Sequence, residues 1–534
     1  MSLARFLKSF VIGAASASLL LVPDPVAAQT RGGTLVMIVQ PEPPTLASYL
    51  STAGPIGQVT AKVYDGLVEY DFDLKPIPGL AESWTTSADG KTIAFKLQKG
   101  VKFHDGKPFT SSDVKFTILE VLKKFHPFGA STFREVEGID TPDEHTAILR
   151  LKGPAPYLMM ALSARESPML PRHLFEGADL QNHPRANSPI GTGPFKFVEW
   201  QRGQFVRLDR NPDYWRPGRP YLDRVVARFI PDSATRAAAM ERGEAHVAGL
   251  AAIYYSDVRR LEKLPHIEVT SRGYELLSAL VELYCNTQRA PFDNPKVRQA
   301  IAYALDRQFV IDNIWFGFGR VATGPISSNF KPAGWYSPEV RSYHVPNGLE
   351  LANQLLDEAG YRRGPNGIRF EIVHDLTPYG EEWRRFGEYM QQMMERLGIK
   401  ATLRYEDVPT WLRRVFTSYD FQLTSNWIFN LADPAIGVHR EYHSKAIRPG
   451  VVFQNAARWS SARADEVMDQ AAVTLEPKKR AALYKEFQQL VVEATPVIWT
   501  HEVLFTTVLN KSYKDVIVSP LGVYGSFDRA HLAR

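Results

Sequence analysis

The stretch from Phe421 to Pro434, FQLTSNWIFNLADP, holds the residue types best suited to binding a small molecule. It starts with the alternation typical of a strand and continues into aromatic, amide and acidic residues. These are Asn426, Trp427, Phe429, Asn430 and Asp433. Aromatic faces bury ligand area, while a few polar groups fix the ligand's orientation. The stretch is therefore a candidate pocket wall, although a buried strand end with core aromatics and a turn at Asp433-Pro434 would have the same composition.

Two histidines follow this stretch at a spacing that could bind a metal. His439 and His443 are four residues apart, and on a helix they could share one ion. Pro434 and Gly437 make a helix uncertain here, so exposed or hydrogen-bonding histidines are the alternative. Arg440 lies between them, where it would repel a cation and would suit a ligand carboxylate. We therefore predict no metal and no cofactor, and count Arg440 among the candidate ligand-binding residues.

Catalytic motifs are missing from the sequence. It contains no GxSxG, HExxH or P-loop pattern, and its carboxylates form no recognisable pair. The single cysteine, Cys285, ends a mostly apolar run and has no histidine motif with it, which favours a small buried hydrophobe over a nucleophile. We predict that the protein is not an enzyme, with an exported hydrolase as the alternative from another functional class.

Composition and the N-terminus indicate an exported globular protein. The chain has 534 residues, 44% of them hydrophobic and 23% charged, with a net charge of +5 and no basic run that would favour nucleic acid. Arg5 and Lys8 precede an apolar segment of signal-peptide length, Phe10 to Leu21. Residues 1–28 therefore read as a signal peptide cleaved near Ala28. No cysteine lies near that site, so we expect a soluble periplasmic protein without a lipid anchor.

The order of predicted elements is that of an α/β protein with more than one domain. Gly33 to Val39 is a buried-strand pattern, and three prolines after it place Thr45 in a loop. Such strand-to-loop edges often contact ligands, which makes Thr45 a candidate. Glu275 to Asn286 predicts a long strand that crosses between domains. A helix is predicted to start at Asn294-Pro295 and to continue to Phe309.

Five blocks in the mature chain resemble the recurring blocks of one family. They are AESWTTSADGKTIAFKLQKGVKFHDGKPFTSSDV at 81–114, GTGPFKF at 191–197, NPDYW at 211–215, PFDNPKVRQAIAYALDR at 291–307 and ANQLLDEAGY at 352–361. Together they resemble the extracellular solute-binding proteins of family 5, the peptide-, dipeptide-, nickel- and opine-binding receptors of bacterial ABC importers. The resemblance covers essentially the whole mature chain, in order.

This resemblance implies a two-lobe periplasmic binding protein fold of type II, with an extra subdomain in the first lobe. Lobe I would combine residues 29–58, 183–277 and 495–534. The extra subdomain would fill 59–182, and lobe II would run over 278–494. Crossings near Ala279 to Cys285 and near Thr495 to His501 would act as the hinge about which the lobes close.

The resemblance also implies the function and its partners. A monomeric receptor would capture a small peptide or peptide-like solute between its lobes and deliver it to membrane permease subunits. Because the chain has no ATP-binding motif, a separate ATPase subunit would supply the energy. A receptor for an opine, an oligosaccharide or a metal complex is the alternative within the family.

The candidate pocket wall departs from the family pattern at one position. In peptide-binding relatives, a Trp is followed three residues later by an Asp that holds the ligand's α-amine. Here Trp427 matches, but the second position is Asn430. Loss of a charge partner in a closed cleft costs about 2–5 kcal/mol. We therefore expect a ligand with a blocked or absent amine, or one held mainly by Trp427 and Phe429, unless Asp433 supplies the carboxylate.

Overall fold

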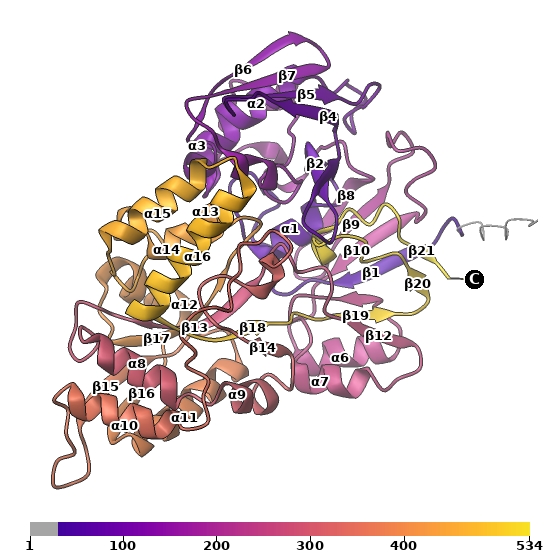
Figure 1. Ribbon diagram of the computed structural model, residues 1–534. Coiled ribbons are helices and arrows are strands. Elements are labelled where there is room, and N and C mark those ends of the chain that lie inside the picture. The colour runs from indigo at the N-terminus through magenta and orange to yellow at the C-terminus, as the bar shows by residue number, and fades with distance from the viewer. Residues whose placement is uncertain (1–29, 534) are drawn as a thin grey trace, which may run out of the picture.

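The computed structural model describes residues 30–533 and shows an α/β protein with two large sheets and a smaller third one (Figure 1). The predicted signal peptide and its cleavage site lie outside the described residues. Among residues 30–533, no helix combines the length and the apolar character that crossing a membrane requires.

The first large sheet is assembled from segments far apart in the sequence. Its strand order is β12-β19-β11-β1-β10-β9-β8, with β1 parallel to both of its neighbours. The strands are β1 (Thr34–Ile38), β8 (Phe195–Gln201), β9 (Phe205–Arg210), β10 (Arg224–Arg228), β11 (Val247–Ala248), β12 (Ile267–Thr270) and β19 (Thr507–Asn510). Helices α6 (Ser233–Glu241) and α7 (Tyr255–Leu261) lie between β10 and β12 in sequence. N-terminal, central and C-terminal segments thus share one sheet.

The extra subdomain carries its own four-stranded sheet, of order β4-β5-β7-β6, at the top of Figure 1. Its strands are β4 (Ala81–Thr86), β5 (Thr92–Leu97), β6 (Val136–Asp143) and β7 (Thr146–Leu151), and the short hairpin β2 (Val68–Tyr70) and β3 (Pro76–Pro78) precedes them. Asp89-Gly90, a dipeptide that predicts a hairpin turn from sequence alone, joins the antiparallel strands β4 and β5. Helix α2 (Ser111–Phe116) begins with a capping box between Thr110 and Asp113.

The second large sheet has the order β14-β18-β13-β17-β15-β16. Its strands are β13 (Ala279–Cys285), β14 (Gly319–Val321), β15 (Phe370–Asp375), β16 (Ile399–Arg404), β17 (Leu423–Phe429) and β18 (Val497–Val503). The main helices between residues 279 and 503 are α8 (Pro295–Ala304), α10 (Gly348–Glu358), α11 (Glu381–Arg396), α15 (Ala462–Val473) and α16 (Pro477–Ala494).

The helix predicted from Asn294-Pro295 starts as expected but is shorter. The Asn294 side chain accepts a hydrogen bond from the Lys296 backbone N–H, and the helix ends at Ala304. A second helix, α9 (Arg307–Asn313), begins because Asp306 accepts a hydrogen bond from the Phe309 backbone N–H at 2.9 Å. Phe309 is consequently 45% exposed and does not extend the apolar face that its spacing predicted.

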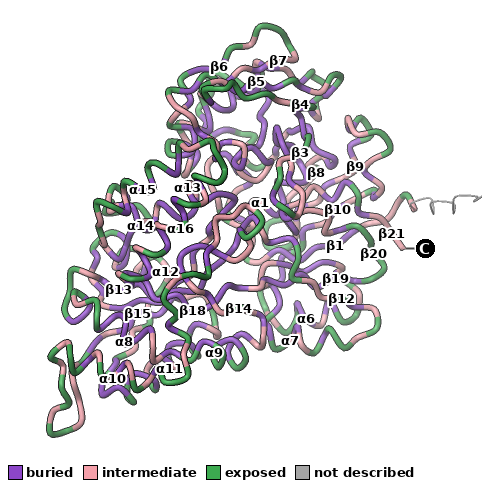
Figure 2. Tube along the Cα trace, viewed as in Figure 1, coloured by how far each residue is buried: buried purple, intermediate pink, exposed green. Residues whose placement is uncertain are grey.

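The two chain segments that connect the large sheets lie next to β13 and β18, the strands that were expected to contain these crossings. Every residue of β13, from Ala279 to Cys285, pairs with β17, and β13 also pairs with β18. Both strands are buried along their whole length in the second sheet (Figure 2). The chain therefore passes between the sheets at residues 271–278 and 504–506, which corrects the predicted hinge positions. The division into lobes stays a prediction, with 497–503 now placed in the second sheet.

Cys285 ends β13 inside this sheet. Its side chain is 0% exposed, and burial raises the pKa of the thiol to about 12. The thiol therefore stays protonated at neutral pH, which agrees with a buried hydrophobe and gives no nucleophile.

A pair of buried carboxyl groups lies against the middle of β13. Glu282 is 0% exposed, and Glu441, from the short helix α14 (His439–Tyr442), is 2% exposed. Their carboxyl groups are within hydrogen-bonding reach of each other, and the hydroxyl groups of Tyr284 and Tyr442 lie beside Glu441. Two carboxylates cannot both be ionised in such a place, so one keeps a proton and donates it to the other.

This pair predicts a pH dependence of stability. Burial, followed by the charge of Glu441, raises the pKa of Glu282 well above its ordinary value of 4.5. The folded state therefore binds a proton that the unfolded state releases, so the free energy of unfolding falls as pH rises above about 4.5. Glu282→Gln keeps a neutral donor facing Glu441 and should flatten this decline in urea unfolding between about pH 5 and about pH 8.

The exposed Glu395→Gln, on α11, is the matched control and should leave the decline unchanged. An unaltered pH profile in Glu282→Gln would show that the buried pair does not hold the proton.

Candidate functional site

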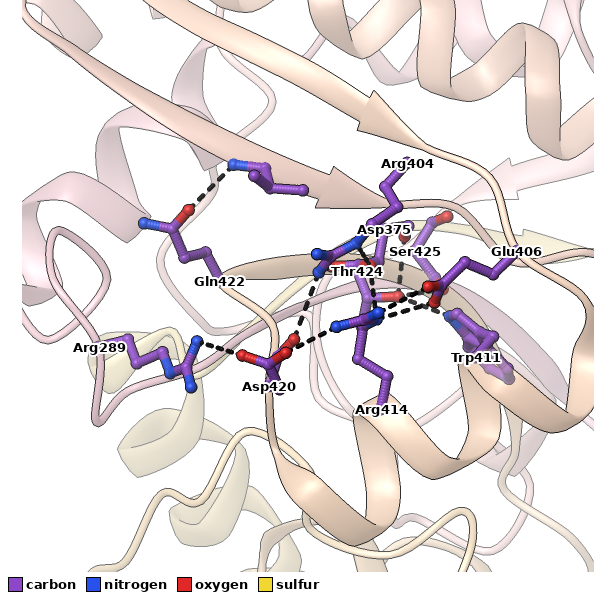
Figure 3. Close-up of polar contacts among 11 residues, drawn as sticks. Arg289, Asp375, Arg404, Glu406, Trp411, Arg414, Asp420, Gln422, Thr424 and Ser425 are labelled. Atoms are coloured by element: carbon purple, nitrogen blue, oxygen red, sulfur yellow. Dashed lines mark hydrogen bonds and ion pairs between the residues drawn. The ribbon is translucent and has the colours of Figure 1, made fainter.

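Strand β17 is fixed in place by a polar network at its N-terminal end (Figure 3). The Thr424 hydroxyl donates to the Asp375 backbone carbonyl at 2.9 Å and accepts from the Trp411 indole N–H at 3.0 Å. The Asp375 carboxylate is 1% exposed and accepts two hydrogen bonds from Arg404, at 2.5 and 2.9 Å. Arg414 lies 3.8 Å from the same carboxylate. These contacts anchor the strand that carries the candidate pocket wall.

Trp427 and Phe429, at the other end of β17, form part of an aromatic cluster. Both side chains are partly exposed and lie on the same face of the strand. The Trp427 ring is 5.3 Å from the Phe505 ring and 5.7 Å from the Trp383 ring, centroid to centroid. Phe505 belongs to the crossing at 504–506, so the cluster spans the junction between the sheets. Apolar ligand area could be buried against it.

Asn430 is completely buried and its amide is used by the protein itself. Its side-chain oxygen accepts from the Ser327 backbone N–H at 2.7 Å, and its side-chain nitrogen donates to the Pro325 carbonyl at 3.1 Å. A carboxylate at this position would face the Pro325 carbonyl with no proton to donate. The amide thus satisfies one donor and one acceptor of the 325–327 backbone, which is a physical reason for the departure from the family pattern.

Asp433 is equally committed to the structure. Its carboxylate accepts from the Ala435 backbone N–H at 2.8 Å at the start of α13 (Pro434–Gly437). It also receives two hydrogen bonds of 2.8 Å from Arg480, whose guanidinium lies 4.8 Å from the centre of the Trp335 ring. With 0% exposure, this carboxylate is not available to replace the acid missing at Asn430.

The remaining predicted site residues are not gathered around Trp427. Asn426 is paired with Glu282 of the neighbouring strand β13, and its side chain donates to the Tyr284 hydroxyl at 3.2 Å. This side chain lies on the opposite face of β17 from Trp427. Thr45 donates to the Asn187 side-chain oxygen at 3.0 Å. Arg440 donates to the backbone carbonyls of Gly437, Phe453 and Phe429.

The two histidines at metal-binding spacing have separate contacts. His443 lies 3.3 Å from both Asp465 and Asp469. His439 packs against Tyr484, and burial lowers its pKa well below the ordinary value. Within the described part of the chain, no three metal-ligating side chains come together.

A cavity, called the junction cavity below, lies where the first sheet, the extra subdomain and the segment that follows β17 meet. Its volume is about 20 Å³, room for about one water molecule, and the unfilled space between its walls reaches about 550 Å³ only when open solvent is counted. Leu276, Leu277 and Tyr524 come from the predicted first lobe, and Leu431, Ala432 and Ile436 come from the segment that follows β17. Leu431 and Ala432 belong to the candidate pocket wall, whereas none of the predicted ligand-binding residues lines this junction cavity.

Sequence reasoning missed the polar residues of the junction cavity. They come from the extra subdomain and are Tyr70, His126, Thr132, Ser163, Arg165 and Glu166. Arg165 and Glu166 pair with each other, and the Arg165 guanidinium lies 4.8 Å from the centre of the Tyr524 ring. In the sequence they stand in a loop-rich region with no motif, so only the packing of distant segments identifies them.

A second cavity is confined to lobe I and the extra subdomain. It is lined by charged residues that are already paired: Arg216 lies 2.7 Å from Glu69 and 3.5 Å from Asp528. No residue between 279 and 503, the span that contains the second large sheet, lines this cavity. The junction cavity is therefore the candidate ligand site.

Comparison with known proteins gives matches over nearly the whole chain. The sequence pattern described as bacterial extracellular solute-binding proteins, family 5 Middle, matches residues 75–449. The oligopeptide-binding protein AppA of Bacillus subtilis is 28% identical over 484 residues, which cover 87% of this chain and 85% of that protein. Heme-binding protein A of Haemophilus influenzae is 30% identical over 499 residues, with 87% and 86% covered.

Solved structures show the same arrangement. The periplasmic binding protein DppA from Helicobacter pylori, in complex with the peptide STSA, superposes with a TM-score of 0.79 at 25% identity, covering 95% of this chain and 99% of that one. The binding protein AgaA from A. tumefaciens R10, in complex with agropinic acid, gives a TM-score of 0.76 at 27% identity, with 94% and 99% covered.

The buried Asp433–Arg480 pair predicts a large effect on stability. Asp433→Ala leaves the Arg480 guanidinium buried, at 6% side-chain exposure, without its counter-charge. Removing one partner of a buried pair costs about 3–5 kcal/mol, which should appear in urea unfolding. Asp140→Ala, which removes a 52% exposed partner of Arg150, should cost less than about 1 kcal/mol. Equal losses in the two variants would contradict the role given to Asp433.

Proposed function

The chain belongs to the bacterial extracellular solute-binding proteins of family 5, and we propose that it is the receptor of an ABC importer. It captures a small peptide-like solute at the junction cavity and delivers it to membrane permease subunits, with a separate ATPase as the energy source. It acts in the periplasm as a monomer after cleavage near Ala28, and it catalyses no reaction.

One observation carries this proposal: the junction cavity is lined by all three parts of the molecule. Leu276 and Leu277 lie in one crossing between the sheets, and Leu431 and Ala432 follow the end of β17. Separation of the two lobes about residues 271–278 and 504–506 would open the cavity to solvent. Closure would then bury the ligand on every side, as in hinge-closing binding proteins.

The ligand's chemistry follows from the groups around the end of β17. Trp427 and Phe429 supply apolar area, whereas Asn430 and Asp433 are occupied by contacts within the protein. A ligand ammonium placed here would be desolvated without a carboxylate. We propose that Trp427 and Phe429 contact the ligand. Asn426, Asn430, Asp433 and Arg440 stabilise the wall behind these two side chains. Thr45 lies at the edge of the first lobe. The ligand is a peptide-like solute whose amine is acylated or absent.

The proposal predicts which solutes stabilise the purified mature protein. N-acetylated di- and tripeptides should raise the melting temperature, and the same peptides with a free amine should not. A ligand at about 100 times its dissociation constant adds roughly 2.7 kcal/mol, which is enough to see in a thermal scan. Opines, short oligosaccharides and nickel complexes complete the panel.

Stabilisation by free and acetylated peptides alike would overturn the blocked-amine ligand and leave a general peptide receptor. Stabilisation by none of the panel would contradict the peptide-like ligand class, and turnover of any of these compounds would favour the exported hydrolase.

A substitution at the aromatic cluster gives an independent check. Trp427→Ala should weaken binding of the stabilising solute by about tenfold or more, because the indole face is lost from the ligand's apolar contact. Isothermal titration calorimetry measures this loss. Trp84→Ala, on β4 of the extra subdomain, is the matched control and should bind as the unaltered protein does. Unchanged affinity in Trp427→Ala would place the ligand away from this wall.

A further inference from the structure

Arg165 is a largely buried cation with few partners. Its side chain is 12% exposed, and its partners are the carboxylate of the neighbouring Glu166 and the Tyr524 hydroxyl. A guanidinium has five N–H donors, so most of this group is not hydrogen-bonded. One of its faces lies against the Tyr524 ring, and the residue lines the junction cavity. Such a cation needs further acceptors, and the cavity is where they can be placed.

His126 is a second donor on the same cavity. It is 5% exposed, and its Nδ1 accepts from the Phe128 backbone N–H at 3.4 Å. The proton of the neutral ring therefore lies on Nε2, and Nε2 has no partner among the described residues. Burial, and then the charge of Arg165, lowers the pKa of His126 to about 4, so the ring is neutral at neutral pH. A buried N–H without an acceptor costs free energy that a bound ligand would recover.

We propose that the Arg165 guanidinium and the Nε2–H of His126 form a carboxylate subsite at the junction cavity. This inference rests on the proposed receptor function and names the group by which the ligand is recognised. The ligand is a small acid whose carboxylate meets these two donors and whose apolar body lies against Leu277, Leu431 and Ile436. An N-acylated amino acid or short N-acylated peptide with a free C-terminus has this chemistry.

The charges around the subsite fit one carboxylate. Glu166 also lines the cavity, but its charge is balanced by its ion pair with Arg165. The remaining N–H groups of Arg165 can bind a second carboxylate in the geometry that guanidinium groups favour. Arg165 and Glu166 together carry no net charge, so the subsite binds a singly charged acid through the free guanidinium N–H groups and the neutral His126 donor rather than through an excess positive charge.

The geometry also explains why a bound solute favours closure of the lobes. His126 and Arg165 come from the extra subdomain, whereas Leu431 and Ile436 come from the second half of the chain. A solute held by both sets of residues makes contacts in the closed form that are absent in the open form. Its binding free energy therefore favours closure.

Paired probes test the proposal: N-acetyl-dipeptides with a free C-terminal carboxylate, and the same compounds with a C-terminal amide. By calorimetry the unaltered protein should bind the acids at least about 30-fold more tightly than the amides, as for loss of a buried charge partner. Arg165→Gln should abolish this preference. His126→Phe should weaken binding of the acids by about tenfold and leave the weak binding of the amides unchanged.

Arg172→Gln is the matched control, since this arginine is 47% exposed and pairs with Glu176 in the same subdomain. It should retain the full preference for acids. Melting curves of the free proteins check that the variants are folded, and Arg165→Lys, which keeps the charge, should recover part of the preference.

Each other outcome has a separate meaning. Equal binding of acid and amide by the unaltered protein would overturn the carboxylate subsite and leave the receptor function standing. Preference for compounds with a free amine and a C-terminal amide would assign recognition to Glu166 and would also overturn it. Failure of every probe to bind would overturn both the subsite and the peptide-like ligand class.

Discussion

The pairing of β13 with β17 on one side and β18 on the other is the constraint on which the junction depends. The crossing at 271–278 leads into β13, and β18 leads into the crossing at 504–506. The first residue after β17, Asn430, continues the ladder by donating its backbone N–H to the Ser278 carbonyl at 3.2 Å. Three strand ends are thereby held together at the place where the lobes meet. A ligand between the lobes therefore contacts the end of a rigid sheet and the two crossings next to that sheet end.

Polar residues after β17 stabilise this strand end more than they offer contacts to a solute. Asn430 bonds to the 325–327 backbone, and Asp433 is paired with Arg480 in the interior. The cost of burying these groups is offset by complete hydrogen bonding. The under-bonded groups lie across the cavity on the extra subdomain, at His126 and Arg165. Recognition is thus shifted from the anchor expected in peptide-binding relatives toward donors that suit an acid.

Local sequence rules predicted the elements well where the signal is local. The Asn294-Pro295 helix start and the Asp89-Gly90 hairpin depend on neighbouring residues, and both are present. The role of Asp433 was not predictable, because its partner Arg480 is 47 residues away. The same limit applies to Arg165, which reaches the cavity only through packing of three parts of the chain. The resemblance to a known family predicted the arrangement of the lobes. The crossings lie outside their predicted positions because β13 and β18 are paired within the second sheet along their length.

The most direct measurement is a crystal structure of the mature protein with the solute that gives the largest melting shift. We expect ligand density at the junction cavity, between Leu277, Leu431 and Tyr524, with the acidic group of the ligand on Arg165. Density in the lobe I cavity beside Glu69 and Arg216, or on the outer surface, would show that the solute is not recognised where the two lobes and the extra subdomain meet.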